Sequence, residues 1–142
     1  MIKHVLARGF FGSPTNPDPP PTDVYAEACP SRAILELIAD KWTLLILPAL
    51  RRGRMRNGDL MRLIGGVSQK MLTQTLRELE HNGLVNRIDH QEVPPRVEYE
   101  LTDLGRSLSD LMRGLDSWAE ENFREVQKAR ETFEAREKAA RR

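Results

Sequence analysis

The chain has 142 residues, enough for one domain with a hydrophobic core. Its 22 Lys/Arg and 21 Asp/Glu leave a net charge of +1, and its single cysteine excludes an intrachain disulfide and a cysteine-rich zinc site. No apolar run approaches the length of a transmembrane helix, and the N-terminus lacks the apolar core of a signal peptide, so we expect a cytoplasmic protein.

The charges are unevenly distributed along the chain. Residues 41–96 contain ten Lys/Arg and five Asp/Glu, a balance of +5, whereas residues 1–40 and residues 97–142 each carry −2. An excess of positive charge over one segment is typical of proteins that bind nucleic acid.

Residues 1–23 divide into a short apolar start and a proline-rich stretch. Five prolines fall within residues 12–22, and this composition predicts a flexible tail or linker without a core of its own. The apolar residues at the start leave a second interpretation open, in which they form an arm that lies on a partner subunit.

Two helices are expected next. Proline suits the first position of a helix, so Pro30 predicts a start there with Cys29 as the cap. Asp40 can cap the second helix through its carboxylate. This second helix is nearly apolar all round, so we expect it to be central and buried, with Trp42 in the core and Pro48 kinking or shortening the last turn.

The segment 51–56 is the most basic in the chain. Such a cluster is usually a solvated loop. If a DNA-binding helix lies beside it, contact with a DNA phosphate becomes equally reasonable, so we include Arg56 among the candidate DNA contacts. Residues 55–56 can add a short strand to a small sheet. A third helix should follow and end at the glycine pair 65–66, with Leu60, Leu63 and Ile64 facing inward.

The next predicted helix, residues 68–82, is the one on which the functional argument depends. Ser68 is a suitable N-cap, and Gly83 suits the position after the C-terminus. One face carries leucines, and the opposite face carries amide, hydroxyl and cationic groups without a carboxylate, which suits base edges and phosphates in a DNA major groove. A solvated surface is the alternative interpretation. The candidate contacts are Ser68, Gln69, Lys70, Thr73, Gln74 and Arg77.

Extended chain follows this helix. Apolar and polar residues alternate over 97–101, which predicts a half-buried strand, and residues 84–88 supply a partner strand. A helix followed by a hairpin with a projecting loop is typical of a winged helix, in which the helix enters the major groove and the wing lies on the backbone or in the minor groove. We therefore expect the wing, residues 84–101, to contact DNA through Arg87 and Arg96.

Thr102 can cap a long last helix whose apolar residues recur every three or four positions. The domain is too small to cover an apolar stripe of this length, which argues for a homodimer that forms through this helix. Residues 24–38 are expected to contribute to the same interface. A two-fold dimer would place two recognition helices at half-sites about one helical turn, or about 34 Å, apart. Residues 124–142 read as a charged helical extension or tail. The expected interface residues are Leu108, Leu111, Leu115 and Trp118.

Six segments in this order resemble one known family. They are residues 29–30, 40–47, 68–80, 83–87, 92–99 and 101–105. Together they resemble the HxlR family of bacterial transcription regulators, within the MarR-like superfamily, over roughly residues 27–120. Two residue pairs depart from the family pattern: Ala39-Asp40 stands where the family has Gly-Gly, and Arg56-Asn57 stands where it has Arg-Phe, which removes an aromatic core anchor.

The resemblance implies a mainly α fold with a small β-hairpin, a winged helix-turn-helix with N- and C-terminal dimerisation helices. We place this domain at residues 24–123. The implied function is a homodimeric regulator in the bacterial cytosol that binds double-stranded DNA at a pseudo-palindromic operator, without a cofactor or metal. A winged-helix module for RNA or protein is the second hypothesis. An enzyme is not expected, because the three histidines show no catalytic or metal-binding spacing.

Cys29 could be structural, as a small residue at a helix start, or it could be a sensor. It matches the cysteine of the Cys-Pro motif at which some HxlR-family members respond to oxidants or electrophiles. A position at the N-terminus of a helix also favours a thiolate. With one cysteine per chain, the chemistry would be a mixed disulfide, an alkylation, or a bridge to the partner subunit's Cys29.

Overall fold

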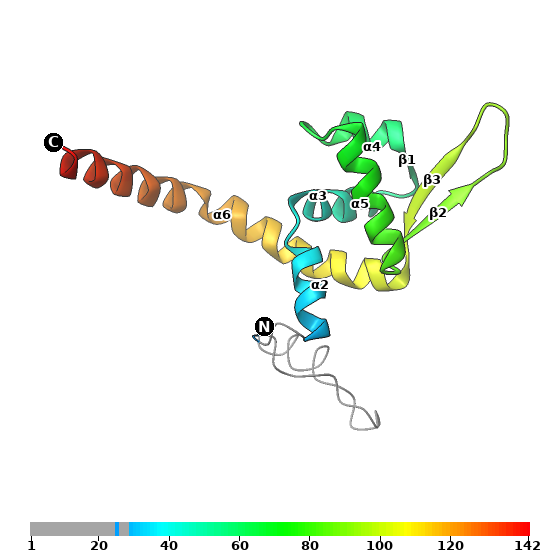
Figure 1. Ribbon diagram of the computed structural model, residues 1–142, viewed down its shortest axis with the longest axis horizontal. Coiled ribbons are helices and arrows are strands. Elements are labelled where there is room, and N and C mark those ends of the chain that lie inside the picture. The colour runs from blue at the N-terminus through cyan, green and yellow to red at the C-terminus, as the bar shows by residue number, and fades with distance from the viewer. Residues whose placement is uncertain (1–24, 26–28) are drawn as a thin grey trace, which may run out of the picture. The chain divides into compact units, whose positions relative to one another are not determined.

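The computed structural model describes Tyr25 and residues 29–142. The predicted tail, residues 1–23, therefore lies outside the described residues. The fold is mainly helical with one three-stranded antiparallel sheet, as the sequence predicts (Figure 1). The chain divides into two units, residues 1–44 and 45–142, which we describe separately. No helix in the described part of the chain is long and apolar enough to cross a membrane.

The first unit contains α2 (Pro30–Ile38) and the start of α3 (Lys41–Leu50). Cys29 occupies the N-cap position and Pro30 the first helical position, as predicted. The Asp40 carboxylate caps α3, because its Oδ1 accepts hydrogen bonds from the backbone N–H groups of Trp42 at 2.9 Å and Thr43 at 3.3 Å.

The burial expected for α3 is only partly observed. Trp42 is half-buried instead of lying in the core, and the Lys41 Nζ lies 4.5 Å from the centroid of its ring. The ammonium covers ring surface that packing leaves open. In the second unit, Ile46 and Leu47 are fully buried but Leu45 is 48% exposed, so the helix is apolar all round without being buried all round.

The end of α3 shows the effect expected of Pro48. The α-helix stops at Leu50, and the N–H groups of the next three residues bond to carbonyls three residues earlier. Gly53 then reverses the chain with a φ of +127°, a conformation that glycine adopts without a steric penalty.

Three strands form the sheet of the second unit. They are β1 (Met55–Arg56), β2 (Val85–Asp89) and β3 (Val97–Leu101), in the order β1-β3-β2. The predicted short strand at residues 55–56 is confirmed, since Met55 pairs with Tyr99. All five residues of β3 are half-buried, without the predicted alternation, because α4 and α6 both contact this central strand.

Two helices, α4 (Asn57–Leu63) and α5 (Gln69–His81), make up the helix-turn-helix, with Gly66 in the turn at φ +83°. Leu60 faces inward as expected, but Leu63 is 41% exposed, because the helix ends there and the chain leaves in an extended conformation. The α5 helix lies beside β2, and the β2–β3 hairpin projects away from the helices (Figure 1). The buried apolar side chains of this unit are Ile46, Leu47, Ala49, Leu50, Leu60, Ile64, Val67, Leu72, Leu76, Leu79, Leu84, Val85 and Met112.

The start of α6 (Asp103–Ala140) is attached to the corner between α5 and β2. The Thr102 backbone N–H bonds to the Leu84 carbonyl at 3.1 Å, and the Thr102 hydroxyl donates to the Gly83 carbonyl at 2.6 Å. The same hydroxyl oxygen accepts from the Gly105 N–H at 3.0 Å, which confirms the predicted cap. One joint therefore sets the positions of α5, the hairpin and α6.

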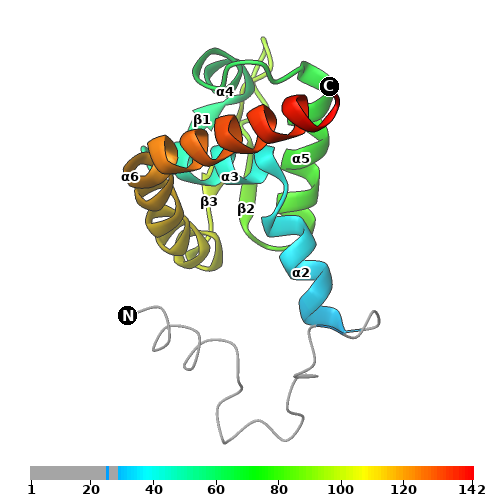
Figure 2. The ribbon, with the colours of Figure 1, turned by 90° about the vertical axis from the view of Figure 1, so that its left-hand side faces the viewer.

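Beyond this joint α6 continues as one helix of 38 residues. Its distal half runs away from the sheet, α4 and α5 in Figure 1, and in Figure 2, which is turned by 90°, it lies in front of them. Of the two alternatives for residues 124–142, the structure shows a helical extension, which ends at Ala140.

Candidate nucleic-acid interface

The orientation of α5 follows from its two ends and its apolar face. The Ser68 Oγ accepts a hydrogen bond from the Met71 N–H at 3.1 Å, and Gly83 ends the helix with a φ of +74°. Leu72, Leu76 and Leu79 are at most 1% exposed. With this face fixed in the core, the opposite face of α5 must point to solvent.

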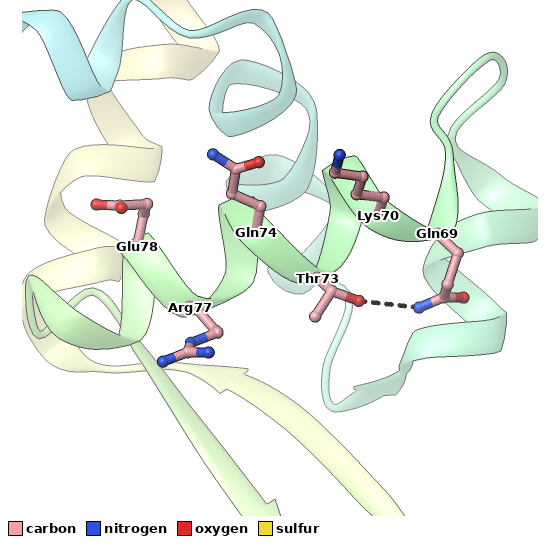
Figure 3. A pocket seen from close by; sticks show the side chains of 6 residues that line it. All are labelled: Gln69, Lys70, Thr73, Gln74, Arg77 and Glu78. Carbon is pink, nitrogen blue, oxygen red and sulfur yellow. Dashed lines mark hydrogen bonds between the residues drawn. The ribbon is translucent and has the colours of Figure 1, made fainter.

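Six side chains of α5 line one hollow on that outer face (Figure 3). Five of them are the residues that the sequence places there. The sixth is Glu78, so the expectation of a face without a carboxylate is wrong. Its position was visible in the spacing, since a residue eight positions after Lys70 and four after Gln74 lies on the same side of a helix. The hollow is lined by Gln69, Lys70, Thr73, Gln74, Arg77 and Glu78.

The six side chains form two rows along the helix. Gln69, Thr73 and Arg77 make up one row, in which the Gln69 Nε2 lies 3.0 Å from the Thr73 Oγ1 (Figure 3). Lys70, Gln74 and Glu78 make up the other, and within the described chain none of these three forms an ion pair. The face thus offers amide, cationic and carboxylate groups that the fold itself does not use.

The arginines around the loop after α3 differ from those of α5. Arg51 forms an ion pair with Asp110 of α6, and the Arg54 Nε lies 2.8 Å from the Glu100 Oε2 of β3. These acids neutralise two charges of the most basic stretch. Arg52 and Arg56 are exposed and form no ion pair in the part of the chain that the structure describes, so Arg56 keeps a cation available.

Asp59 fixes the chain around Arg56. Its Oδ2 accepts from the Arg56 backbone N–H at 3.0 Å, and this bond, with the nearby Arg62 guanidinium, lowers the pKa of the Asp59 carboxyl. The carboxylate therefore stays ionised and holds the start of α4 through the Arg56 backbone, and the charge of the Arg56 side chain is the smallest contribution to the lowered pKa.

Arg96 and Arg87 occupy different environments on the wing. The Arg96 guanidinium lies 3.3 Å from the Glu98 Oε1 and 3.8 Å from the Glu92 Oε1. The Arg87 Nη1 has only a distant ion pair, 3.9 Å from the Asp89 Oδ2, and its side chain is 43% exposed. The sequence predicts both arginines as DNA contacts without distinguishing them. In the structure the Arg87 guanidinium is the more available for a phosphate, because its ion pair is the weaker.

Glu98 is the centre of a small cluster where the two strands of the wing meet its loop. Its Oε1 lies 2.7 Å from the His90 Nε2, and both side chains are less than one fifth exposed. The hydrogen bond from His90, assisted by the Arg96 charge, lowers the pKa of the Glu98 carboxyl. The cluster ties both strands of the hairpin together next to the projecting loop.

Apolar side chains on a different face of α6 remain exposed. Gly105, Ser109 and Met112 are buried, and they account for the face of α6 that packs on its own unit. Of the predicted interface residues, Leu108 borders that face and is half-buried, whereas Leu111 is 45% exposed, Leu115 is 56% exposed and Trp118 is 59% exposed.

Two further observations concern chemistry outside DNA contact. Cys29 is only 4% exposed at the start of α2. Among the described residues, no group of three or more His, Cys, Asp or Glu side chains could hold a metal ion.

Comparisons with known proteins agree with this geometry. A family model described as HxlR-like helix-turn-helix matches residues 37–127. The HTH-type transcriptional regulator YtfH of Escherichia coli (strain K12) is 50% identical over 104 residues, which cover 73% of this chain and 82% of YtfH.

Two solved structures extend the agreement to the fold. The transcriptional regulator ytfH from Salmonella typhimurium is 48% identical, with a TM-score of 0.73, over 77% of this chain and 97% of that one. The redox regulator HypR in its reduced form is 36% identical, with a TM-score of 0.64, over 70% of this chain and 98% of HypR. The resemblance found in the sequence is thereby confirmed, and the chain belongs to the HxlR-like helix-turn-helix family of transcriptional regulators.

Proposed function

We propose that this regulator binds duplex DNA sequence-specifically, with α5 in the major groove and the β2–β3 wing on the backbone or minor groove. The observation that carries the proposal is the outer face of α5, where Lys70, Gln74 and Arg77 are exposed and none of them forms an ion pair or side-chain hydrogen bond within the described chain. Amide and cationic groups are those that read base edges and neutralise phosphates. Ser68 would place the N-terminus of α5 on a phosphate.

RNA or protein binding is the alternative for the same face. A mobility-shift assay on a mixed-sequence duplex, with RNA of the same sequence as competitor, separates the two. We expect the duplex to bind with an affinity that falls as salt rises, by a slope of about 0.9 per phosphate contact, and RNA to compete poorly. Equal competition by RNA, or no duplex binding at low salt, would refute the proposal.

We further propose that the active species is a two-fold homodimer that forms through α6. Support comes from the exposed stripe Leu111, Leu115 and Trp118, because contiguous apolar surface on a helix is characteristic of an interface. In α2, Ile34 is 50% exposed and Leu35 is 41% exposed, so this helix also has apolar surface that could contact a partner subunit. A dimer would present two α5 helices to the half-sites of a pseudo-palindromic operator.

The dimer is tested by Leu115→Asp. A charge placed in the stripe should produce monomers in analytical ultracentrifugation that have lost operator affinity. Asp116→Ala, on the adjacent position, serves as control and should remain dimeric. A wild-type chain that is monomeric at micromolar concentration and still binds DNA tightly would contradict the dimer.

The third proposal is that Cys29 responds to oxidants or electrophiles. It rests on the position of Cys29 at the N-cap of α2 and on the similarity to HypR, a redox regulator. Because the side chain is only 4% exposed, reaction requires the start of α2 to open, which predicts slow modification. Diamide with glutathione, or a quinone, should lower the DNA affinity of the wild type and not of Cys29→Ser. An equal response of both proteins, or of neither, would make Cys29 structural.

A further inference from the structure

Thr73 behaves differently from the other helical threonines whose hydroxyls are hydrogen-bonded. In a helix, a threonine hydroxyl commonly donates to the carbonyl four residues earlier. Thr75 does so to Met71 at 2.8 Å, and Thr132 does so to Lys128 at 2.9 Å. Thr73 instead accepts a hydrogen bond from a side chain, the Gln69 carboxamide, at 3.0 Å (Figure 3).

This bond leaves a defined set of groups pointing outward. One N–H of the Gln69 amide is used by Thr73, so its second N–H and its Oε1 remain, one donor and one acceptor. The Thr73 methyl group points away from Gln69 (Figure 3). Both residues are exposed and belong to the first two turns of α5, the end of a recognition helix that meets base edges.

We propose that Thr73 is a positioning residue for Gln69, and that the two together recognise an A·T base pair in each half-site. This inference rests on the proposed binding of α5 in a major groove. The free donor and acceptor of Gln69 match the N7 acceptor and N6 amino group of adenine, and the Thr73 methyl group matches the C5 methyl of thymine on the same or a neighbouring pair. Guanine presents two acceptors in the major groove, one of which would face the Gln69 Oε1 and disfavour binding.

The comparison with Gln74 shows what the hydrogen bond adds. Gln74 lies on the same face, and its amide has no hydrogen-bond partner among the described residues. Such an amide loses rotamer freedom when it binds, whereas the Gln69 amide is already restricted by Thr73. We therefore expect the preference for one base to be sharper at the position read by Gln69 than at that read by Gln74.

The experiment uses two variants of one residue that separate its two groups. Thr73→Val keeps a methyl group and loses the hydroxyl, and Thr73→Ser keeps the hydroxyl and loses the methyl. Valine, serine and threonine have similar helix propensities, and position 73 is exposed, so both variants should fold like the wild type. Thermal unfolding of each variant checks this before binding is measured.

The DNA probe is a duplex selected by the wild-type protein from a random-sequence pool. In this duplex each adenine is replaced in turn by 7-deazaadenine, which lacks the N7 acceptor, and each thymine by uracil, which lacks the methyl group. For the wild type we expect one A·T site per half-site at which 7-deazaadenine weakens binding about fivefold or more, and a thymine on that or the next pair at which uracil weakens it about fourfold.

The two variants should respond in opposite ways. Thr73→Val should lose the sensitivity to 7-deazaadenine and keep the sensitivity to uracil, and Thr73→Ser should show the reverse. Gln69→Ala should lose the 7-deazaadenine effect at the same site. The double variant Gln69→Ala/Thr73→Val should lose no more DNA affinity than either single variant.

The contrary outcomes are distinct. If Thr73→Val keeps the 7-deazaadenine effect, or if Gln69→Ala abolishes it at a different base pair, the positioning role is overturned while DNA binding by α5 stands. If the wild type enriches no duplex from the pool, the proposed function fails and this inference fails with it.

Discussion

The outer face of α5 and the β2–β3 wing are both candidates for DNA contact, but they differ in how many of their groups the fold already uses. Lys70, Gln74 and Arg77 are exposed without ion pairs among the described residues, whereas Arg96 on the wing is bound by Glu92 and Glu98. A cation that is already paired contributes less binding free energy through a phosphate contact, because its existing ion pair must be broken first. We therefore propose that α5 supplies sequence recognition and that the wing mainly positions the protein on DNA.

The joint between α5, the wing and α6 offers the strongest way to break this arrangement. A Cβ at Gly105 would lie 1.9 Å from the Leu84 carbonyl oxygen, a backbone atom that cannot rotate away. Gly105→Ala should therefore destabilise the protein by about 3 kcal/mol or more, the upper part of the range for overpacking. Thermal unfolding measures the effect.

Gly114→Ala is the matched control for this prediction. No atom lies within 4 Å of a Cβ at Gly114, so alanine should raise stability by up to about 1 kcal/mol through its higher helix propensity. If the two variants unfold at the same temperature, the close approach of α6 to Leu84 is not a feature of the folded protein.

The next prediction tests the contribution of α5 to sequence preference through the side-chain amide of Gln74. Gln74→Ala should weaken binding to the preferred sequence by about 1–3 kcal/mol and relax the preference at one base pair, if its amide makes a bidentate base contact. Competition titrations against mixed-sequence DNA measure both quantities. Gln127→Ala, which changes an exposed glutamine on the distal part of α6, should leave them unaltered.

A smaller difference is expected between the two wing arginines. Arg87→Ala should weaken all sequences alike and reduce the salt slope by about 1, as for the loss of one phosphate contact. Arg96→Ala should have less effect, because Glu92 and Glu98 already bind the guanidinium. Binding isotherms at several salt concentrations test this order, and a larger loss for Arg96→Ala would reverse our assignment of the available cation.

The smallest effect concerns pH and the cluster at the loop end of the wing. The pKa of Glu98 is lowered from its usual value of 4.5 by the hydrogen bond from His90 and the charge of Arg96. A carboxyl with a lowered pKa in the folded state contributes stability above its unfolded pKa and loses it as the pH falls through the folded pKa. Between about pH 5 and pH 3 the wild type should therefore lose melting temperature more steeply than Glu98→Gln. Parallel curves for the two proteins would mean that the cluster does not stabilise the wing.

The local features of this fold could be predicted because they depend on residues close in sequence. Asp40, Ser68 and Thr102 each cap a helix with a side-chain oxygen two or three residues from its donor, as their types and positions predict. The leucine face of α5 also follows from spacing alone, and it fixes which side chains face outward.

Features that depend on distant residues could not be predicted in the same way. The acid that pairs with Arg51 is 59 residues away, and the acid that pairs with Arg54 is 46 residues away. A charge count over residues 41–96 includes these arginines without their partners, so it overstates the cations available to DNA. Leu45 and Leu63 were expected inside for a similar reason, since periodicity gives the apolar face of a helix but not how far neighbours cover it.

The central claim, that α5 and not the wing reads the sequence, is tested most directly by selection from a random-sequence duplex pool. Three proteins should be compared: the wild type, the variant with Gln69, Gln74 and Arg77 changed to alanine, and the variant with Arg87 and Arg96 changed to alanine. We predict that the wild type and the wing variant enrich the same motif, while the α5 variant enriches none and retains only weak, salt-sensitive binding. Enrichment of the same motif by the α5 variant, or a changed motif for the wing variant, would contradict the account.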